Sequence, residues 1–193
     1  THGQPNEINA HPHMSGKVAI VHNGIIENFR ELRDELQADG RSFESETDSE
    51  VIAQLIDKNM NDGMDAVDAF EAALKKLSGA FAIAAIFADD TDLLIGARKG
   101  SPLVLGYGEG EMFLGSDAIA LAPFTRDVTY LEEGDWVVLT PDSHDIRNVD
   151  GERVNRPRVQ SAVNESLIER GEYDHFMLKE IHEQPESLAR SIL

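Results

Sequence analysis

The stretch KVAIVHNG, residues 17–24, decides the fold of this chain. Residues 17–22 are mostly apolar and rich in Val and Ile, which predicts a buried β-strand. Asn23-Gly24 follows this strand, and the sequence beyond it has the periodicity of a helix. A buried strand that leads into a helix favours a layered fold that mixes the two kinds of element.

Three helices are predicted after this strand, each with an apolar face of helical spacing. The first two carry a side chain that can cap the helix start and an acid three residues later, which is a capping box. The predicted markers are Asn28, Glu31 and the closing Gly40 for the first helix, Thr47 and Glu50 for the second, and Asp65 and Ser78-Gly79 for the start and end of the third.

The pattern changes at residue 80, where short apolar runs replace the helical periodicity. These strand-like runs cover residues 80–88, 93–97, 103–107, 111–114, 128–131 and 136–140. A short helical turn is expected over residues 117–121, and Asp150-Gly151 is typical of a hairpin turn. Helices followed by a meander of strands predict an α+β layered fold with mostly antiparallel sheets.

Apolar residues become sparse between Pro157 and Asp174, which predicts a linker or a surface segment. Two helical stretches follow, residues 176–181 and 187–193, with Pro185 between them. The expected domain organisation is therefore a main domain over residues 1–156 and a connecting segment over residues 157–193.

Charge and composition narrow the classes of function. The formal net charge is −19, which repels phosphate backbones and argues against nucleic acids and anionic membranes as partners. A membrane helix requires about 18 consecutive apolar residues, and no apolar run in this sequence is that long. The chain has no cysteine, so it can form no disulfide or thiolate metal site, and a cytoplasmic location is favoured.

Asn23-Gly24 is the first candidate for chemistry. Glycine allows a close approach to its backbone N–H, and the asparagine side chain adds a second donor. Two donors that converge at the end of a strand can stabilise the oxyanion of an acyl-transfer intermediate. The alternative is a hairpin turn, for which Asn-Gly is a common signal, although a helix and not a paired strand is expected next.

Asp48 is the second candidate, because it stands beside Thr47 at a predicted helix start. Its carboxylate can pair with the ammonium group of a ligand. An acid in this position also complements the positive end of a helix dipole, which is the purely structural alternative.

Two further features have both a functional and a structural interpretation. His2, His11, His13 and His22 could hold a metal ion, but their spacing matches no standard ligand pattern and suits scattered structural or surface histidines. Thr1 could act as a terminal nucleophile with its own amine as the base. Its alternative is that position 1 is simply where this sequence starts.

Eight sequence motifs, in order along nearly the whole chain, resemble the glutaminase domain of the glutamine–fructose-6-phosphate aminotransferases, which are class II glutamine amidotransferases. The motifs are THGQP (1–5), NAHPH (9–13), VHNGIIEN (21–28), SETDSEVI (45–52), ARKGSPL (97–103), GSD (115–117), LEEGD (131–135) and HFMLKEIHEQP (175–185). The resemblance implies an N-terminal-nucleophile hydrolase fold, a four-layer αββα sandwich, here expected to lack its N-terminal part.

The resemblance also implies roles for individual residues. Asn23 supplies the side-chain donor of an oxyanion hole and Gly24 the backbone donor. Thr1 and His2 help hold the α-carboxylate end of the substrate glutamine, and Asp48 pairs with its α-ammonium. No cofactor and no metal are implied, and His11, His13 and His22 receive no role.

In this family an N-terminal cysteine attacks glutamine, and the ammonia released passes to an isomerase domain that converts fructose 6-phosphate to glucosamine 6-phosphate. Neither the cysteine nor that domain is recognisable here, so we expect this chain alone to hydrolyse no glutamine. The intact enzyme is expected to be a cytoplasmic homodimer. The alternatives are another class II glutamine amidotransferase and a non-enzymatic binding module.

Overall fold

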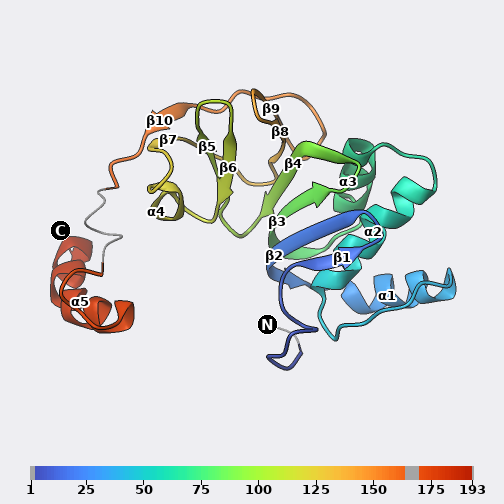
Figure 1. Cartoon of the computed structure of the whole chain (residues 1–193), viewed down its shortest axis with the longest axis horizontal. Helices are drawn as coiled ribbons and strands as arrows, with labels where there is room; N and C mark the ends of the chain where they lie inside the picture. Colours follow the sequence, from blue (N-terminus) through green and yellow to red (C-terminus); the bar gives the residue numbers. More distant parts are fainter. Residues whose placement is uncertain (1–2, 164–169, 193) are drawn as a thin grey trace.

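Two antiparallel sheets form the centre of the computed structural model, which describes residues 3–163 and 170–192 (Figure 1). The strands are β1 (His13–Ser15), β2 (Val18–Ile26), β3 (Gly79–Phe87), β4 (Asp90–Lys99), β5 (Val104–Tyr107), β6 (Met112–Gly115), β7 (Asp127–Tyr130), β8 (Trp136–Thr140), β9 (Ser143–Arg147) and β10 (Arg158–Gln160). The helices are α1 (Phe29–Ala38), α2 (Ser49–Asn61), α3 (Ala66–Leu74), α4 (Ala118–Leu121) and α5 (Phe176–Ile192).

The order of strands separates the two sheets. One sheet has six strands in the order β1-β2-β3-β4-β8-β9, and the other has four in the order β10-β7-β5-β6. Every pairing between these strands is antiparallel. The predicted meander of antiparallel strands is confirmed, and β8 has the bounds expected from the sequence.

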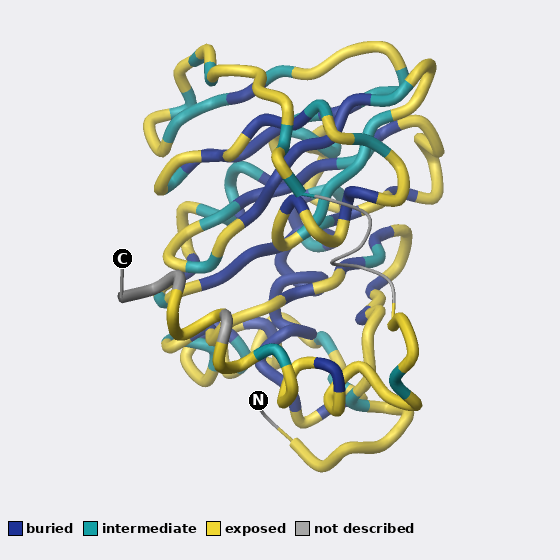
Figure 2. Tube along the Cα trace, turned by 90° about the vertical axis from the view of Figure 1, so that its left-hand side faces the viewer, coloured by how far each residue is buried: buried dark blue, intermediate teal, exposed yellow. Residues whose placement is uncertain are grey.

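Three apolar clusters show how the layers stack. The largest cluster joins helices α1 to α3 to one face of the six-stranded sheet, with Phe70, Ile52 and Ile83 almost fully buried. A second cluster, which includes Leu105 and Leu139, lies between the two sheets, and a third fills the space between α4 and the outer face of the four-stranded sheet. This stacking confirms the predicted α+β class and αββα order, and Figure 2 shows the buried residues along the strands and helices.

Strand β2 is longer than the sequence suggested, because it continues through Asn23 and Gly24 to Ile26. Asn23 lies opposite Ala82 of β3, and Gly24 lies opposite Phe81. The expectation that this dipeptide follows the strand is therefore wrong. The helix predicted next does form, and it begins three residues after β2 at Phe29.

The two predicted capping boxes do not form, although both helices begin within two residues of the expected position. The side chain of Asn28 spans to the turn before β3, where it donates to the Lys76 carbonyl at 2.8 Å and accepts from the Ser78 N–H at 3.0 Å. Helix α2 has Asp48 as its N-cap residue, without a side-chain cap bond. Tertiary partners thus replace the local cap in each case.

The third helix begins as predicted, since Asp65 caps it by accepting from the Asp68 N–H at 2.9 Å. It ends at Leu74, before the predicted stop at Ser78-Gly79. The residues between the two points form a turn that leads into β3.

The segment expected to be a linker or a surface segment contains β10, which pairs with β7 and has exposed side chains. One expectation for the C-terminal part is wrong. Pro185 does not separate two helices but lies inside the continuous helix α5. A proline removes one backbone hydrogen bond from a helix interior without always ending the helix. Residue 193, the end of the second predicted helix, lies outside the described residues.

Candidate functional site

A cavity of about 160 Å³ lies where the end of β2 meets the start of α2. Its walls come from the N-terminal loop, the approach to β1, strand β2 and the first turn of α2. The lining residues are Asn9, His11, His13, His22, Asn23, Gly24, Thr47, Asp48 and Ser49. The structure thus brings together Asn23, Gly24 and Asp48 from the predicted site, while Thr1 and His2 lie outside the described residues.

The backbone of β2 presents a row of N–H groups toward this cavity. The short strand β1 pairs only with residues 18–20 of β2, so the same edge is open to other partners beyond Ile20. On that edge the N–H of His22 donates to Nε2 of His11 at 3.3 Å, and the N–H of Ile26 donates to Oδ2 of Asp48 at 2.7 Å.

Gly24 lies midway between these two donors. Backbone N–H groups alternate between the two edges of a strand, so the Gly24 N–H shares the edge of His22 and Ile26. The pairing with β3 agrees, because Glu27 donates to the Ser78 carbonyl on the opposite edge at 2.8 Å. Gly24 therefore offers a backbone donor to the cavity between two donors that already have acceptors.

Only glycine fits position 24. Its φ is +125°, and a Cβ built there would lie 2.1 Å from the Ala80 carbonyl oxygen and 2.8 Å from the Phe81 Cα. These neighbours are backbone atoms of β3, which cannot move aside without breaking the ladder. Any side chain here would displace the end of β2 and the donor with it.

Asn23 is exposed and lies at the junction of two cavities. The second cavity, of about 210 Å³, runs between the two sheets and is lined by Leu103 and Leu114 among others. Asn23 and Gly24 thus line the first cavity together, and Asn23 also lines the cavity between the sheets. Two neutral donors so arranged can stabilise an oxyanion.

Asp48 is buried, with 4% of its surface exposed, and forms part of the cavity wall. It stands at the N-terminus of α2, where an acid complements the positive end of the helix dipole, which is the structural interpretation given above. The same carboxylate also holds the end of β2 through the Ile26 N–H and faces the cavity. The two interpretations are thus compatible in one residue.

A buried polar network supports the turn before Asp48. Glu50 accepts from the backbone N–H groups of Glu44 (3.0 Å) and Ser45 (2.7 Å) and from Oγ of Ser45 (2.7 Å). Burial alone would raise the pKa of Glu50, but the hydrogen bonds from Ser45 and from the backbone of Glu44 outweigh it and hold this pKa below its usual value. Glu50 is therefore charged at neutral pH and fixes the turn.

The network continues through hydroxyl groups to β1. Oγ of Ser45 lies 2.9 Å from Oγ1 of Thr47, which lies 3.4 Å from Nε2 of His13. Burial, and then the neighbouring His11, lowers the pKa of His13. His13 is consequently a neutral structural histidine at pH 7. Among residues 3–163 and 170–192, no group of three or more possible ligands is arranged to hold a metal ion.

Ser49 and His22 form a pair that the sequence did not suggest. Oγ of Ser49 lies 2.9 Å from Nδ1 of His22, a distance typical of a nucleophile and its base. Both residues are buried, with 6% and 5% of their surfaces exposed. Both residues also line the cavity, and their contact links α2 to β2.

The fold and the cavity define a class: a two-sheet α+β protein with paired donors and a buried acid at the end of one strand. The sequence profile of the glutamine amidotransferase domain family matches residues 4–123. The chain belongs to this family.

Curated relatives point to one kind of glutamine amidotransferase. The chain is 57% identical to glutamine–fructose-6-phosphate aminotransferase (isomerising) from Mesorhizobium japonicum over 192 residues, which cover 100% of this chain and 32% of the relative. It is 56% identical, with the same coverage, to the enzyme of that name from Zymomonas mobilis. The chain thus spans about a third of the length of these relatives.

Solved structures confirm the fold. A glutamine phosphoribosylpyrophosphate amidotransferase from Bacillus subtilis, complexed with ADP and GMP, superposes with a TM-score of 0.62 at 24% identity and covers 75% of this chain and 33% of its own. A glutamine aminotransferase class-II domain protein from Silicibacter pomeroyi gives a TM-score of 0.51 at 16% identity, with coverage of 74% and 71%.

No helix among the described residues is long and apolar enough to cross a membrane.

Proposed function

We propose that this chain forms the glutamine-binding wall of a glutamine–fructose-6-phosphate aminotransferase. The observation that carries the proposal is the cavity in which the Gly24 N–H, the Asn23 side chain and the buried carboxylate of Asp48 meet. The names of the relatives at 57% and 56% identity support this choice among glutamine amidotransferases.

The proposed site separates the two ends of glutamine. Asp48 binds the α-ammonium, because its side chain lines the cavity and a carboxylate forms charge-assisted hydrogen bonds with an ammonium group. Thr1 and His2 hold the α-carboxylate end. The side-chain amide of glutamine then lies against Asn23 and Gly24, whose N–H groups donate hydrogen bonds to its carbonyl oxygen.

The proposed reaction uses these donors in the transition state. A thiolate attacks the side-chain amide carbon, and the carbonyl oxygen becomes an oxyanion that accepts from Asn23 and Gly24. Collapse of the intermediate breaks the C–N bond, releases ammonia and leaves a glutamyl thioester, which water hydrolyses to glutamate. No thiol exists in these 193 residues, so the chain supplies binding and oxyanion stabilisation and not the nucleophile.

The remaining assignments belong to the whole protein. The ammonia serves to convert fructose 6-phosphate to glucosamine 6-phosphate on an isomerase domain, in a cytoplasmic homodimer. Residues 1–156 form the glutaminase part and residues 157–193 the connection to the isomerase part, with β10 as a point where the connection still pairs with the glutaminase sheet.

Two assays test this proposal. Calorimetric titration of the 193-residue chain with L-glutamine is expected to show binding, while an assay for glutamate release by the same chain is expected to show none. The chain extended on both sides to the length of its curated relatives is expected to release glutamate. Turnover by the 193-residue chain itself would overturn the account and make Thr1 and Ser49 the residues to substitute.

The extended protein also tests the oxyanion donors. Asn23→Ala is expected to lower kcat about 100- to 1000-fold, because it removes one donor to the developing oxyanion. The KM for glutamine should change little. An Asn23→Ala enzyme with normal kcat would remove Asn23 from the proposed oxyanion hole.

A further inference from the structure

The N-terminal loop, residues 3–10, contacts the cavity at one residue. All of its residues are exposed except Asn9, which is partly buried and lines the cavity. Within the loop, Asn6 caps the backbone of Asn9, with its Oδ1 2.9 Å from the Asn9 N–H. The Ala10 N–H donates to the Glu7 carbonyl at 3.4 Å.

The side chain of Asn9 joins this loop to a distant part of the chain. Its Oδ1 accepts from the Glu46 N–H at 3.0 Å, and its Nδ2 donates to the Gln4 carbonyl at 2.9 Å. One amide group thus bonds at the same time to the turn before α2 and to the start of the N-terminal loop. Hydrogen bonds from both ends of a planar amide fix its orientation.

Gly3 packs against this same junction. A Cβ at Gly3 would lie 2.5 Å from Nδ2 of Asn9 and 3.3 Å from Cβ of Glu46, and its φ is +78°. The first described residue of the loop therefore fits against both partners of the bridge only because it is glycine.

The turn that Asn9 holds leads directly to Asp48. Glu46 stands two residues before it, and the Glu50 network fixes the other side of the same turn. We propose that Asn9 is a positioning residue for the α-amino acid end of glutamine. Its side chain sets the distance between the turn that precedes Asp48 and the N-terminal loop. This inference rests on the proposed function and adds to that site a residue that received no role in the sequence analysis.

In the proposed site the α-ammonium is bound at Asp48, the α-carboxylate at Thr1 and His2, directly before this loop, and the side-chain amide at Asn23 and Gly24. Three contacts at fixed separations define the configuration of the α-carbon, so the site can distinguish the L from the D enantiomer of glutamine. A chain with a loosened bridge keeps Asp48 but loses the geometric relation between these contacts. Discrimination between enantiomers should therefore fall together with affinity.

The experiment compares Asn9→Ala with Asn6→Ala as a matched control. Both substitutions remove an asparagine that makes hydrogen bonds in the same loop, but only Asn9 bridges to Glu46. Calorimetry with L-glutamine and D-glutamine measures the affinity of the 193-residue chain. Asn9→Ala is expected to weaken L-glutamine binding about tenfold, as the loss of two hydrogen bonds implies, and to bring the two enantiomers closer in affinity.

Gly3→Ala provides a second variant that disturbs the bridge from the other side. It should reduce affinity and discrimination in the same direction, and the double variant should be less than additive because both changes act on one contact. If circular dichroism shows that Asn9→Ala is unfolded, the affinity and enantiomer discrimination of Gly3→Ala test the role of the bridge instead.

The outcomes separate this inference from the function on which it rests. If the unsubstituted chain binds no L-glutamine, the proposed function fails and the inference fails with it. If that chain binds L-glutamine and the bridge variants match Asn6→Ala in affinity and discrimination, only the role of Asn9 is overturned.

Discussion

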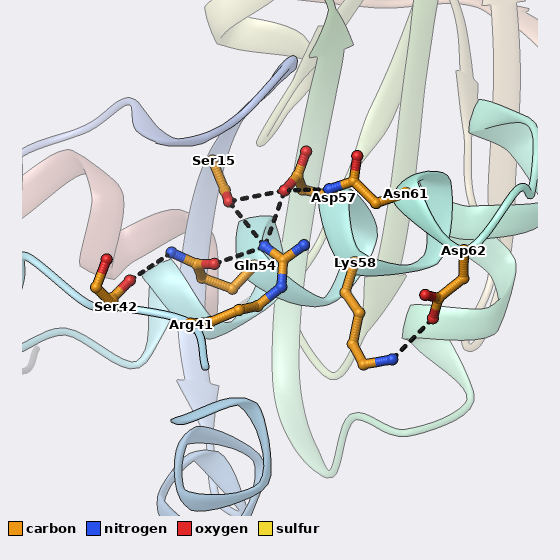
Figure 3. A network of polar contacts seen from close by, with 8 residues as sticks. All are labelled: Ser15, Arg41, Ser42, Gln54, Asp57, Lys58, Asn61 and Asp62. Carbon is orange, nitrogen blue, oxygen red and sulfur yellow. Dashed lines mark hydrogen bonds and ion pairs between the residues drawn. The ribbon is translucent and has the colours of Figure 1, made fainter. Parts of the chain in front are cut away.

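Two buried acids on or next to helix α2 have different surroundings. Asp57, in the third turn, is 2.8 Å from Nη1 of Arg41, accepts a hydrogen bond from Asn61 at 3.1 Å and lies 3.3 Å from the Ser15 hydroxyl (Figure 3). Asp48, at the helix start, accepts from the Ile26 backbone and forms part of a cavity wall.

The two acids show that the same helix both joins parts of the fold, through Asp57, and contributes to the wall of the cavity, through Asp48. Figure 3 shows Arg41 between Gln54 and Asp57, with Ser15 of β1 completing the cluster, so this acid ties α2 to β1 and to the segment after α1. Gly16 belongs to the same arrangement, because a Cβ there would lie 2.1 Å from Oδ1 of Asp57. The carboxylate of Asp57 pairs with a guanidinium and joins parts of the fold, whereas the carboxylate of Asp48 lines the cavity, where we propose that it binds a ligand.

The largest effect expected from this comparison is on stability. Asp57→Ala should lower the free energy of unfolding by about 3 kcal/mol, because it leaves the mostly buried Arg41 without its carboxylate. Urea denaturation measures this change. Asp62→Ala, which breaks an exposed pair with Lys58 on the same helix, is the control and should leave the denaturation midpoint unchanged. A stable Asp57→Ala chain that has lost glutamine binding would reverse the roles assigned to the two acids.

The next effect concerns ligand affinity. Asp48→Asn keeps an oxygen that can accept from Ile26 but removes the negative charge, so L-glutamine should bind about 10- to 100-fold more weakly. The thermal midpoint should change much less than in Asp57→Ala. Asp65→Asn, at the N-cap of α3, is the matched control because its side chain caps a helix far from the cavity. Equal losses in both variants would mean that Asp48 acts only as a helix-start acid.

Glu50 should have a smaller, pH-dependent effect. Its pKa in the folded chain lies below the usual 4.5, so its contribution is fully present above about pH 4.5 and is lost as the pH falls through the folded-state value. Glu50→Gln should cost about 2 kcal/mol at pH 7, and the difference from the unsubstituted chain should shrink in acid. Denaturation curves at several pH values measure it, and a constant difference would contradict a charged Glu50.

The smallest effect is expected at His13, whose folded-state pKa lies below 6.5. The unfolded chain binds this proton more readily. The contribution of neutral His13 to the free energy of unfolding is therefore fully present above about pH 6.5 and is lost as the pH falls through the folded-state pKa. His13→Gln should flatten this part of the stability profile, measured by thermal melts between pH 5 and 7.5. The titratable neighbours of His13 are His11, Asp48 and Glu50, so His11→Gln serves as the comparison. An unchanged slope in His13→Gln would assign the dependence to another group.

The sequence predicted those features of the fold that depend on local pattern. Short apolar runs located most strands, and Asp65 located the start of α3, because its cap is made within three residues. Tertiary partners decided the rest. Asn28 and Glu50 have the right residue types for capping boxes, yet each bonds elsewhere, since a neighbouring backbone offered better geometry than the helix end.

The site was predictable in part for the same reason. Asn23, Gly24 and Asp48 were identified from motifs, and the structure places all three on one cavity, while their roles stay predictions. Asn9 was part of a recognised motif, but its bridge to Glu46 spans 37 residues and leaves no local signal. The Ser49–His22 pair was missed because 27 residues separate its members.

The hydrogen bonds made by the N–H groups of β2 also bear on how readily this exposed strand edge can pair with another chain. An open strand edge can recruit a strand from another chain, which is a common route to aggregation. His11 and Asp48 accept hydrogen bonds from the N–H groups of His22 and Ile26, on either side of Gly24. An incoming strand would therefore find two of three successive backbone donors on this edge already bonded. The two contacts that flank the Gly24 N–H therefore also limit the pairing of this edge with another polypeptide.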